Sequence, residues 1–196
     1  MINRRMLLGL VPAGVLGVGL AGTAGWMATH GDPASTGIGG PFRLTAGDGR
    51  TVTDADFRGR WMLVYFGYTR CPDACPTALQ DMANAVDALG PDAARRVALL
   101  FITIDPERDT PALVQDYVSA FNAPITALSG TPEQIAAAAR AYRVYYAKHP
   151  RDDGGYDMDH SSIIYLMDPR GVLVGNFTHE TPPDAITTKL RAVLAV

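Results

Sequence analysis

WMLVYFGYTRCPDACP, residues 61–76, is the stretch that decides the fold of this chain. It opens with a continuous apolar run, residues 61–66, of the kind expected in a buried strand. Cys71 and Cys75, the only two cysteines, follow that run, and a helical pattern begins directly after them. A strand that leads through two thiols into a helix places sulfur where backbone N–H groups and the helix dipole favour the thiolate.

The spacing of the two cysteines indicates a shared target. Residues i and i+4 lie on the same face of a helix, so both sulfurs can point at a metal ion or at each other. Pro76 suits the first helical position, and we expect the helix to begin there. The alternative is a structural disulfide or two inert core thiols. A disulfide across one helical turn is strained, so we expect such a bond to be labile.

Strands and helices alternate along the rest of the chain. Such alternation predicts an α/β fold with a central, mainly parallel sheet covered by helices on both faces. An N-terminal β-hairpin is expected around Gly47-Asp48-Gly49. The expected elements are strands 61–66, 97–104, 125–128, 163–167 and 172–177, and helices from 76 to about 89, 110–121, from 131, and 183–196.

Chemistry-bearing residues follow the first two buried strands. Cys71 comes after the first and Asp105 after the second. In sheets of this kind ligands bind at the carboxyl ends of the strands, so we expect these two loops to be neighbours. Asp105 is equally well explained as a helix N-cap or turn residue.

His160 is the candidate third ligand, directly before strand 163–167. A lone histidine in a loop is usually only solvated. In a thioredoxin-like fold, however, the loop before this strand packs over the start of the cysteine-bearing helix and normally carries a cis-proline. Here His160 takes that place. Two thiolates and an imidazole suit copper, whereas a structural zinc site needs four ligands and the sequence supplies three.

Three segments together resemble the Sco (SenC) family of copper chaperones, which are thioredoxin-like proteins of the periplasm or the mitochondrial intermembrane space. They are YFGYTRCPDACP (65–76), ITIDPERDTP (102–111), and DHSS (159–162) with the following strand, DPRG (168–171) and the upstream YRVYY (142–146). The resemblance spans roughly residues 40–196. The family often has His where this chain has Arg70, a cation that favours thiolate.

This resemblance implies that Cys71, Cys75 and His160 bind copper, with Cys71 and Cys75 also forming a redox-active pair. It implies that Asp105 lies close by, where it tunes the site or takes part in the copper–thiol chemistry. The implied partner is cytochrome c oxidase subunit II, or another copper protein. The chain would hand over copper to its binuclear copper centre, reduce its cysteines, or do both. A thiol reductant protein is a further expected partner.

Other functions were weighed against copper delivery. A metal-independent thiol–disulfide oxidoreductase would have the same fold, but such enzymes usually carry Cys-x-x-Cys and a cis-proline in the facing loop. A peroxiredoxin-like peroxidase needs a threonine three residues before its cysteine, where this chain has Tyr68. A copper sensor that acts through protein contacts stays open.

The N-terminus predicts export. Arg4 and Arg5 precede an uncharged stretch, residues 6–29, long enough to cross a bilayer. The positive-inside rule then leaves the domain outside the cytoplasm. We expect residues 1–29 to be a single anchor in the cell inner membrane, with the domain in the periplasm, or a cleaved export signal. Residues 30–40 are a linker by composition, and residues 41–196 form the copper-binding domain.

Composition fits one globular domain. The chain has 196 residues, of which 47% are apolar and 19% are charged. Its formal net charge of −3 gives no reason to expect nucleic-acid binding.

Overall fold

The computed structural model describes residues 37–195. The chain divides into two units, residues 1–35 and 36–196, and the fold below is that of the second. The predicted anchor, residues 1–29, and most of the predicted linker lie outside the described residues and stay predictions. Within residues 37–195, no helix combines the length and the apolar character needed to cross a membrane.

A seven-stranded sheet, in the order β2-β1-β5-β4-β3-β8-β9, forms the centre of the domain. The three middle strands, β3, β4 and β5, run parallel, and the strands on either side of them pair antiparallel. Each flank ends in a hairpin, β1–β2 on one side, as predicted, and β8–β9 on the other. The strands are β1 (Arg43–Ala46), β2 (Thr51–Thr53), β3 (Trp61–Gly67), β4 (Val97–Thr103), β5 (Ile125–Ser129), β8 (Ile163–Met167) and β9 (Leu173–Thr178).

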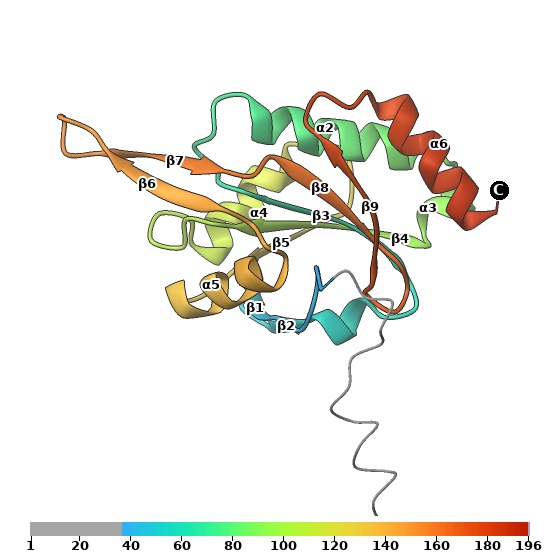
Figure 1. Cartoon of the computed structure of the whole chain (residues 1–196), viewed down its shortest axis with the longest axis horizontal. Coiled ribbons are helices and arrows are strands. Elements are labelled where there is room, and N and C mark those ends of the chain that lie inside the picture. The colour runs from blue at the N-terminus through green and yellow to red at the C-terminus, as the bar shows by residue number, and fades with distance from the viewer. Residues whose placement is uncertain (1–36, 196) are drawn as a thin grey trace, which may run out of the picture. The chain divides into compact units, whose positions relative to one another are not determined.

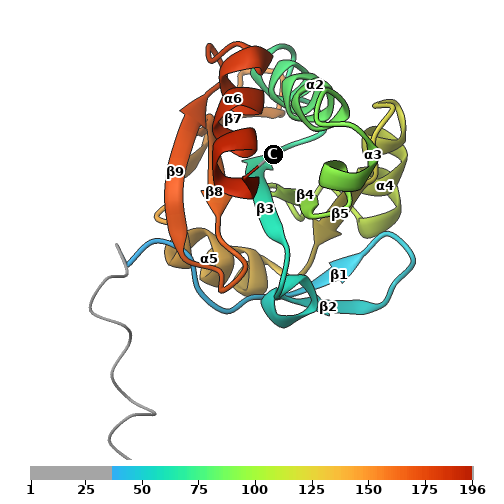
Figure 2. The same ribbon diagram turned by 90° about the vertical axis from the view of Figure 1, so that its right-hand side faces the viewer.

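Helices cover both faces of this sheet, which confirms the predicted α/β fold. In Figure 2, α2, α3, α4 and α6 lie on one side and α5 on the other. Right-handed crossovers from β3 to β4 and from β4 to β5 place α2 and α4 on the same side. The helices are α2 (Ala74–Asp87), α3 (Pro91–Ala94), α4 (Pro111–Ser119), α5 (Pro132–Ala141) and α6 (Pro183–Leu194), with a 3₁₀ turn η1 at Asp54–Phe57.

Helix boundaries differ in places from the sequence prediction. The cysteine-bearing helix begins at Ala74, not at Pro76, and ends at Asp87. Pro76 is therefore the third helical residue. A backbone N–H at this position would have no acceptor within the helix, so a proline here costs no helical hydrogen bond. In α4, which was predicted as residues 110–121, Val114 and Val118 face the core, whereas Leu113 is 41% exposed.

The segment before β8 contains a hairpin that the sequence analysis did not predict. Within the described part of the chain, strands β6 (Tyr146–Pro150) and β7 (Tyr156–His160) pair only with each other, as a separate two-stranded sheet. Figure 1 shows this hairpin extending away from the central sheet. The placement of His160 in a loop was wrong, because it is the last residue of β7. Few apolar side chains occur in this hairpin, so its sequence gave little strand signal.

A buried carboxylate links the loops after β3 and β4. Asp109 accepts hydrogen bonds from the Thr69 N–H at 2.9 Å, the Thr69 hydroxyl at 2.6 Å and the Thr103 hydroxyl at 2.7 Å. Its own backbone carbonyl accepts one from the Ser129 hydroxyl of β5 at 2.6 Å. The expectation that the loops after these two strands are neighbours is thereby confirmed.

Asp109→Ala tests the importance of this carboxylate for stability. The substitution leaves one buried donor, the Thr103 hydroxyl, and two part-buried donors of Thr69 without an acceptor, so we expect the free energy of unfolding to fall by about 3 kcal/mol. Chemical denaturation of the full chain measures it. Asp92→Ala is the control, because the Asp92 carboxylate is exposed and pairs only with Arg95 on the surface of α3. Equal effects of the two substitutions would contradict the role given to Asp109.

Candidate metal centre

Three side chains predicted from the sequence meet at one end of the sheet. The ligand atoms of Cys71, Cys75 and His160 all lie within 4.8 Å of one another. Each comes from a different part of the fold: the turn after β3, the first turn of α2, and the end of β7. A group of two sulfurs and one imidazole nitrogen at this distance could hold a metal ion.

The sulfur of Cys71 takes the place of a helix cap. Asp73, at the N-cap position of α2, makes no capping hydrogen bond with its side chain. The backbone N–H of Cys75 instead donates to Cys71 Sγ at 3.3 Å. This N–H is one of the four at a helix start that have no partner within the helix. The position therefore favours a negatively charged sulfur.

Cys75 is fully buried beneath the end of β3. The Tyr65 hydroxyl, also buried, lies 3.9 Å from Cys75 Sγ and can donate to it. Gly67 is needed for the close approach, since a Cβ there would lie 2.7 Å from the Cys75 sulfur and 2.9 Å from the ring of Phe101. The glycine thus leaves room for the second thiol.

His160 is oriented by its backbone neighbour and by two tyrosine rings. Its Nδ1 lies 3.2 Å from the Ser161 carbonyl oxygen, which can only accept, so Nδ1 carries the proton in this hydrogen bond. The lone pair of Nε2 is then free, and Nε2 lies 3.6 Å from Cys75 Sγ. Tyr65 and Tyr68 pack edge-on against the imidazole, with ring centroids 6.0 and 5.7 Å away. The hydrogen bond to Ser161 fixes the tautomer of the histidine, and the two ring contacts restrict its orientation.

The two thiols differ in acidity. A hydrogen bond from the Cys75 side chain, working against burial, lowers the pKa of Cys71 to about 4. Burial, together with the neighbouring Cys71 thiolate, raises the pKa of Cys75. Without metal, the pair therefore holds one thiolate at Cys71 and one thiol at Cys75. Metal binding through both sulfurs has to displace the Cys75 proton.

The cluster opens to solvent on one side. A pocket of about 290 Å³ lies over it, lined by Tyr68, Cys71 and His160, by residues 72–74 and by Met158, Asp159 and Ser162. Cys71 and His160 are partly exposed, whereas Cys75 is not. A binding partner can therefore reach two of the three ligand atoms directly.

Asp105 lies on the neighbouring loop but outside the ligand cluster. Its buried carboxylate accepts a hydrogen bond from the Tyr156 hydroxyl at 2.7 Å and pairs with Arg108. The sequence analysis missed Tyr156, Arg108, Tyr65 and Asp109. A signal for Tyr156 was present, since Tyr156, Met158 and His160 alternate with aspartates at the period of a strand.

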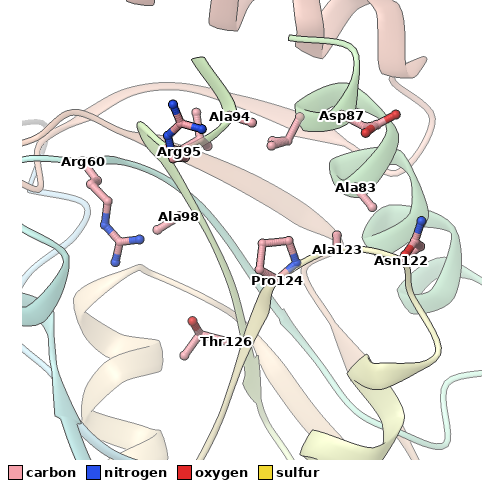
Figure 3. A pocket seen from close by; sticks show the side chains of 12 residues that line it. Arg60, Ala83, Asp87, Ala94, Arg95, Ala98, Asn122, Ala123, Pro124 and Thr126 are labelled. Carbon is pink, nitrogen blue, oxygen red and sulfur yellow. The ribbon is translucent and has the colours of Figure 1, made fainter. Parts of the chain in front are cut away.

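A second pocket is unrelated to the thiols. It has a volume of about 450 Å³ and lies at the N-terminal ends of β4 and β5, between α2 and α3. Figure 3 shows Arg60 and Arg95 beside mostly apolar side chains such as Pro124. No cysteine or histidine is among the residues that line it.

Fold and cluster together define a class: a thioredoxin-like protein whose two cysteines and one histidine converge at the carboxyl end of the sheet. Comparison with known families then identifies the chain more closely. Residues 31–195 match the sequence model of the SCO1/SenC family, and the chain belongs to that family.

Named relatives agree with this assignment. The mitochondrial SCO1 homolog of Homo sapiens is 44% identical over 146 residues, covering 71% of this chain and 47% of the relative. The mitochondrial SCO1 homolog 1 of Arabidopsis thaliana is 42% identical over 150 residues, covering 76% of this chain and 45% of the relative. This chain thus spans about half the length of the curated relatives it matches.

Solved structures show the same fold. ScoI of Bradyrhizobium japonicum with copper bound is 44% identical, with a TM-score of 0.73 over 79% of this chain and 98% of that one. ScoI of Arabidopsis thaliana with copper bound is 39% identical, with a TM-score of 0.75. The match covers 81% of this chain and 99% of that one.

The unequal thiols predict a selective alkylation reaction. In the reduced, metal-free chain, iodoacetamide should modify Cys71 at a rate that follows its thiolate fraction. Because the folded pKa is lowered to about 4, the rate should be level down to about pH 5 and fall as the pH drops through the pKa. Cys75 should stay unmodified. Peptide mass spectrometry gives both rates.

Cys75→Ala is the matched variant for this experiment. It removes the hydrogen bond that contributes most to the lowered pKa of Cys71, so the midpoint of the profile should move to higher pH. A wild-type midpoint near the ordinary thiol value of about 8.5 would contradict the assignment of the thiolate to Cys71.

Proposed function

We propose that this protein is a copper chaperone that binds one copper ion through Cys71, Cys75 and His160. One observation carries the proposal: the two sulfurs and the imidazole nitrogen lie within 4.8 Å of one another. The copper-bound structures of the two ScoI relatives support it.

The donor set favours copper over zinc. Thiolates are soft ligands that select Cu(I), and the imidazole adds a nitrogen that also suits Cu(II). A structural zinc site is closed by four ligands. Within residues 37–195, no carboxylate and no further histidine joins the three side chains of this cluster. A site with three ligands and one open side is also suited to transferring its metal to a partner protein.

Delivery follows from the unequal exposure of the ligands. A partner's own ligands can approach from the side of Cys71 and His160, and copper passes by ligand exchange through a mixed site. Cys75 would be the last ligand to dissociate from the copper, and its sulfur would then regain a proton. We propose cytochrome c oxidase subunit II, or another copper protein, as the acceptor. Oxidation of Cys71 and Cys75 by a partner's disulfide, which takes up the two electrons and becomes two thiols, would remove both thiolate ligands.

A metal-independent thiol–disulfide oxidoreductase is the second candidate, and the low pKa of Cys71 favours it. The Cys71 thiolate would attack a partner's disulfide and release one partner thiolate, forming a mixed disulfide. Cys75 would lose its proton and attack Cys71, releasing the second partner thiol. A thiol reductant protein would then restore the pair. Burial and a raised pKa make Cys75 a poor attacking group, which weighs against this role.

We also propose the location predicted from the N-terminus. Residues 1–29 would anchor the chain in the cell inner membrane with the copper domain in the periplasm, or would direct export and be cleaved. The basic pair Arg4 and Arg5 before the uncharged stretch supports this orientation. Membrane fractionation with protease added to spheroplasts tests it, and a domain protected from that protease would contradict it.

Copper stoichiometry is the direct test of the metal site. The reduced chain should retain one copper, and His160→Ala should weaken the affinity because it removes one of three ligands. His179→Ala is the control, since His179 is not part of the cluster. Competition with a chromophoric copper chelator measures the affinities. If no copper is retained and the Cys71–Cys75 pair cycles easily regardless of His160, the chaperone proposal fails and the oxidoreductase remains.

Transfer distinguishes delivery from thiol reduction. The copper-loaded chain is mixed with the metal-free soluble domain of an oxidase subunit II whose cysteines are already reduced. We expect copper to appear in the acceptor after the two proteins are separated. If the acceptor gains nothing in this form, and the metal-free chain instead reduces its oxidised form, copper delivery is contradicted.

A further inference from the structure

The hairpin that carries His160 does not belong to the central sheet. Among residues 37–195, strands β6 and β7 pair only with each other, so no backbone ladder to the sheet places His160 opposite Cys75. Side chains alternate between the two faces of a strand. Tyr156, Met158 and His160 therefore share the inner face of β7, and Asp157 and Asp159 are exposed on the other.

Tyr156 is joined to the loop after β4 by three contacts. Its hydroxyl donates to Asp105 Oδ1 at 2.7 Å. The Arg108 guanidinium stacks over its ring at 3.7 Å and donates through Nη1 to its backbone oxygen at 2.9 Å. Arg108 also pairs with Asp105 Oδ2. We refer to Tyr156, Asp105 and Arg108 together as the Tyr156 clamp.

A second contact joins the hairpin to the same loop. Lys148 of β6 pairs with Glu107 and lies 4.7 Å from the centre of the Tyr156 ring. The Asp105 carboxylate is fully buried, and a buried charge is tolerated only when it is paired and hydrogen-bonded. Burial, together with the hydrogen bond to Asp105, raises the pKa of Tyr156 to about 12, so the phenol keeps its proton and remains the donor.

The loop 105–109 thereby contacts both segments that carry the candidate ligands, the turn before α2 and the hairpin β6–β7. At one end of this loop Asp109 binds Thr69, two residues before Cys71. At the other end Asp105 binds Tyr156, four residues before His160. The two ends are held together, because the Asp109 N–H donates to the Asp105 carbonyl at 2.9 Å.

We propose that Tyr156 and Asp105 are positioning residues for His160, which they set against Cys75 by clamping β7 to the loop 105–109. This inference rests on the proposed copper site. It differs from the expectation that Asp105 itself tunes the metal, because both of its carboxylate oxygens are already taken by Tyr156 and Arg108. Asp105 acts on the metal through the hairpin.

Tyr156→Phe removes only the hydroxyl that donates to Asp105. We expect the copper affinity of the full chain to fall about tenfold, as for other outer contacts of a metal ligand. Tyr145→Phe is the matched control, because Tyr145 adjoins the same hairpin, is 62% exposed, and has no hydroxyl hydrogen bond within the described residues. In Cu(II)-loaded chain, nitrogen hyperfine coupling in the electron paramagnetic resonance spectrum should weaken in Tyr156→Phe alone. Unchanged affinity and coupling would overturn the proposal.

A double-mutant cycle separates the two possible roles of Asp105. If Asp105 acts through Tyr156, Asp105→Ala should weaken copper binding far less in the Tyr156→Phe background than in the wild type. Additive losses of affinity would mean that Asp105 acts on the metal by itself, and would overturn the proposal.

Amide hydrogen exchange tests the clamp without any metal. In the metal-free chain, Tyr156→Phe should raise the exchange rates of the β6–β7 amides about tenfold, and Tyr145→Phe should not. Unchanged rates in Tyr156→Phe would overturn the clamp even where the wild type binds copper. If the wild type binds none, the proposed function fails, and the exchange rates still decide whether the clamp holds the hairpin.

Discussion

The carboxylate of Asp109 is the contact on which the rest of the site depends. It binds Thr69 beyond β3 and Thr103 at the end of β4, and its backbone oxygen binds Ser129 of β5. Three parallel strands are thereby linked at the end where the thiols lie. Four residues before Asp109 in the same loop, Asp105 binds the hairpin that carries His160. The two buried carboxylates thereby hold the segments that carry the candidate ligands next to each other.

Helix geometry and burial give the two thiols different acidities and different exposure to solvent. The Cys71 sulfur accepts a hydrogen bond from the Cys75 N–H at the start of α2. Its lowered pKa makes Cys71 a thiolate at neutral pH. Cys75 lies in the core below Gly67 and keeps its proton until a metal displaces it. Copper uptake therefore releases a proton from the pair, and copper release takes one up. In the proposed copper site, the buried thiol would add to the affinity, and the partly exposed thiolate and imidazole would give a partner access to the metal.

Local sequence patterns were enough to predict the central strands and the three candidate ligands. The apolar runs of β3 and β4 showed that both faces of these strands are covered, and the sulfur spacing with His160 pointed to one cluster, which the geometry brings together. The pairing of Asp105 with Tyr156 and of Asp109 with Thr69 was not predictable, because these hydrogen bonds depend on how segments far apart in sequence meet. The hairpin β6–β7 was missed because its exposed, charged residues lack the apolar repeat of a strand in a core. The helix start was misplaced because the sulfur of Cys71 serves as an unusual cap.

X-ray absorption at the copper edge of the loaded, reduced chain tests the central claim most directly, because it counts the ligands of the bound ion. We expect two sulfur neighbours and one imidazole nitrogen, with the imidazole signal absent in His160→Ala and retained in His179→Ala. Copper held by two sulfurs alone, with a spectrum that is the same in His160→Ala, would contradict it. In that case the histidine next to the thiols would have no part in holding the metal.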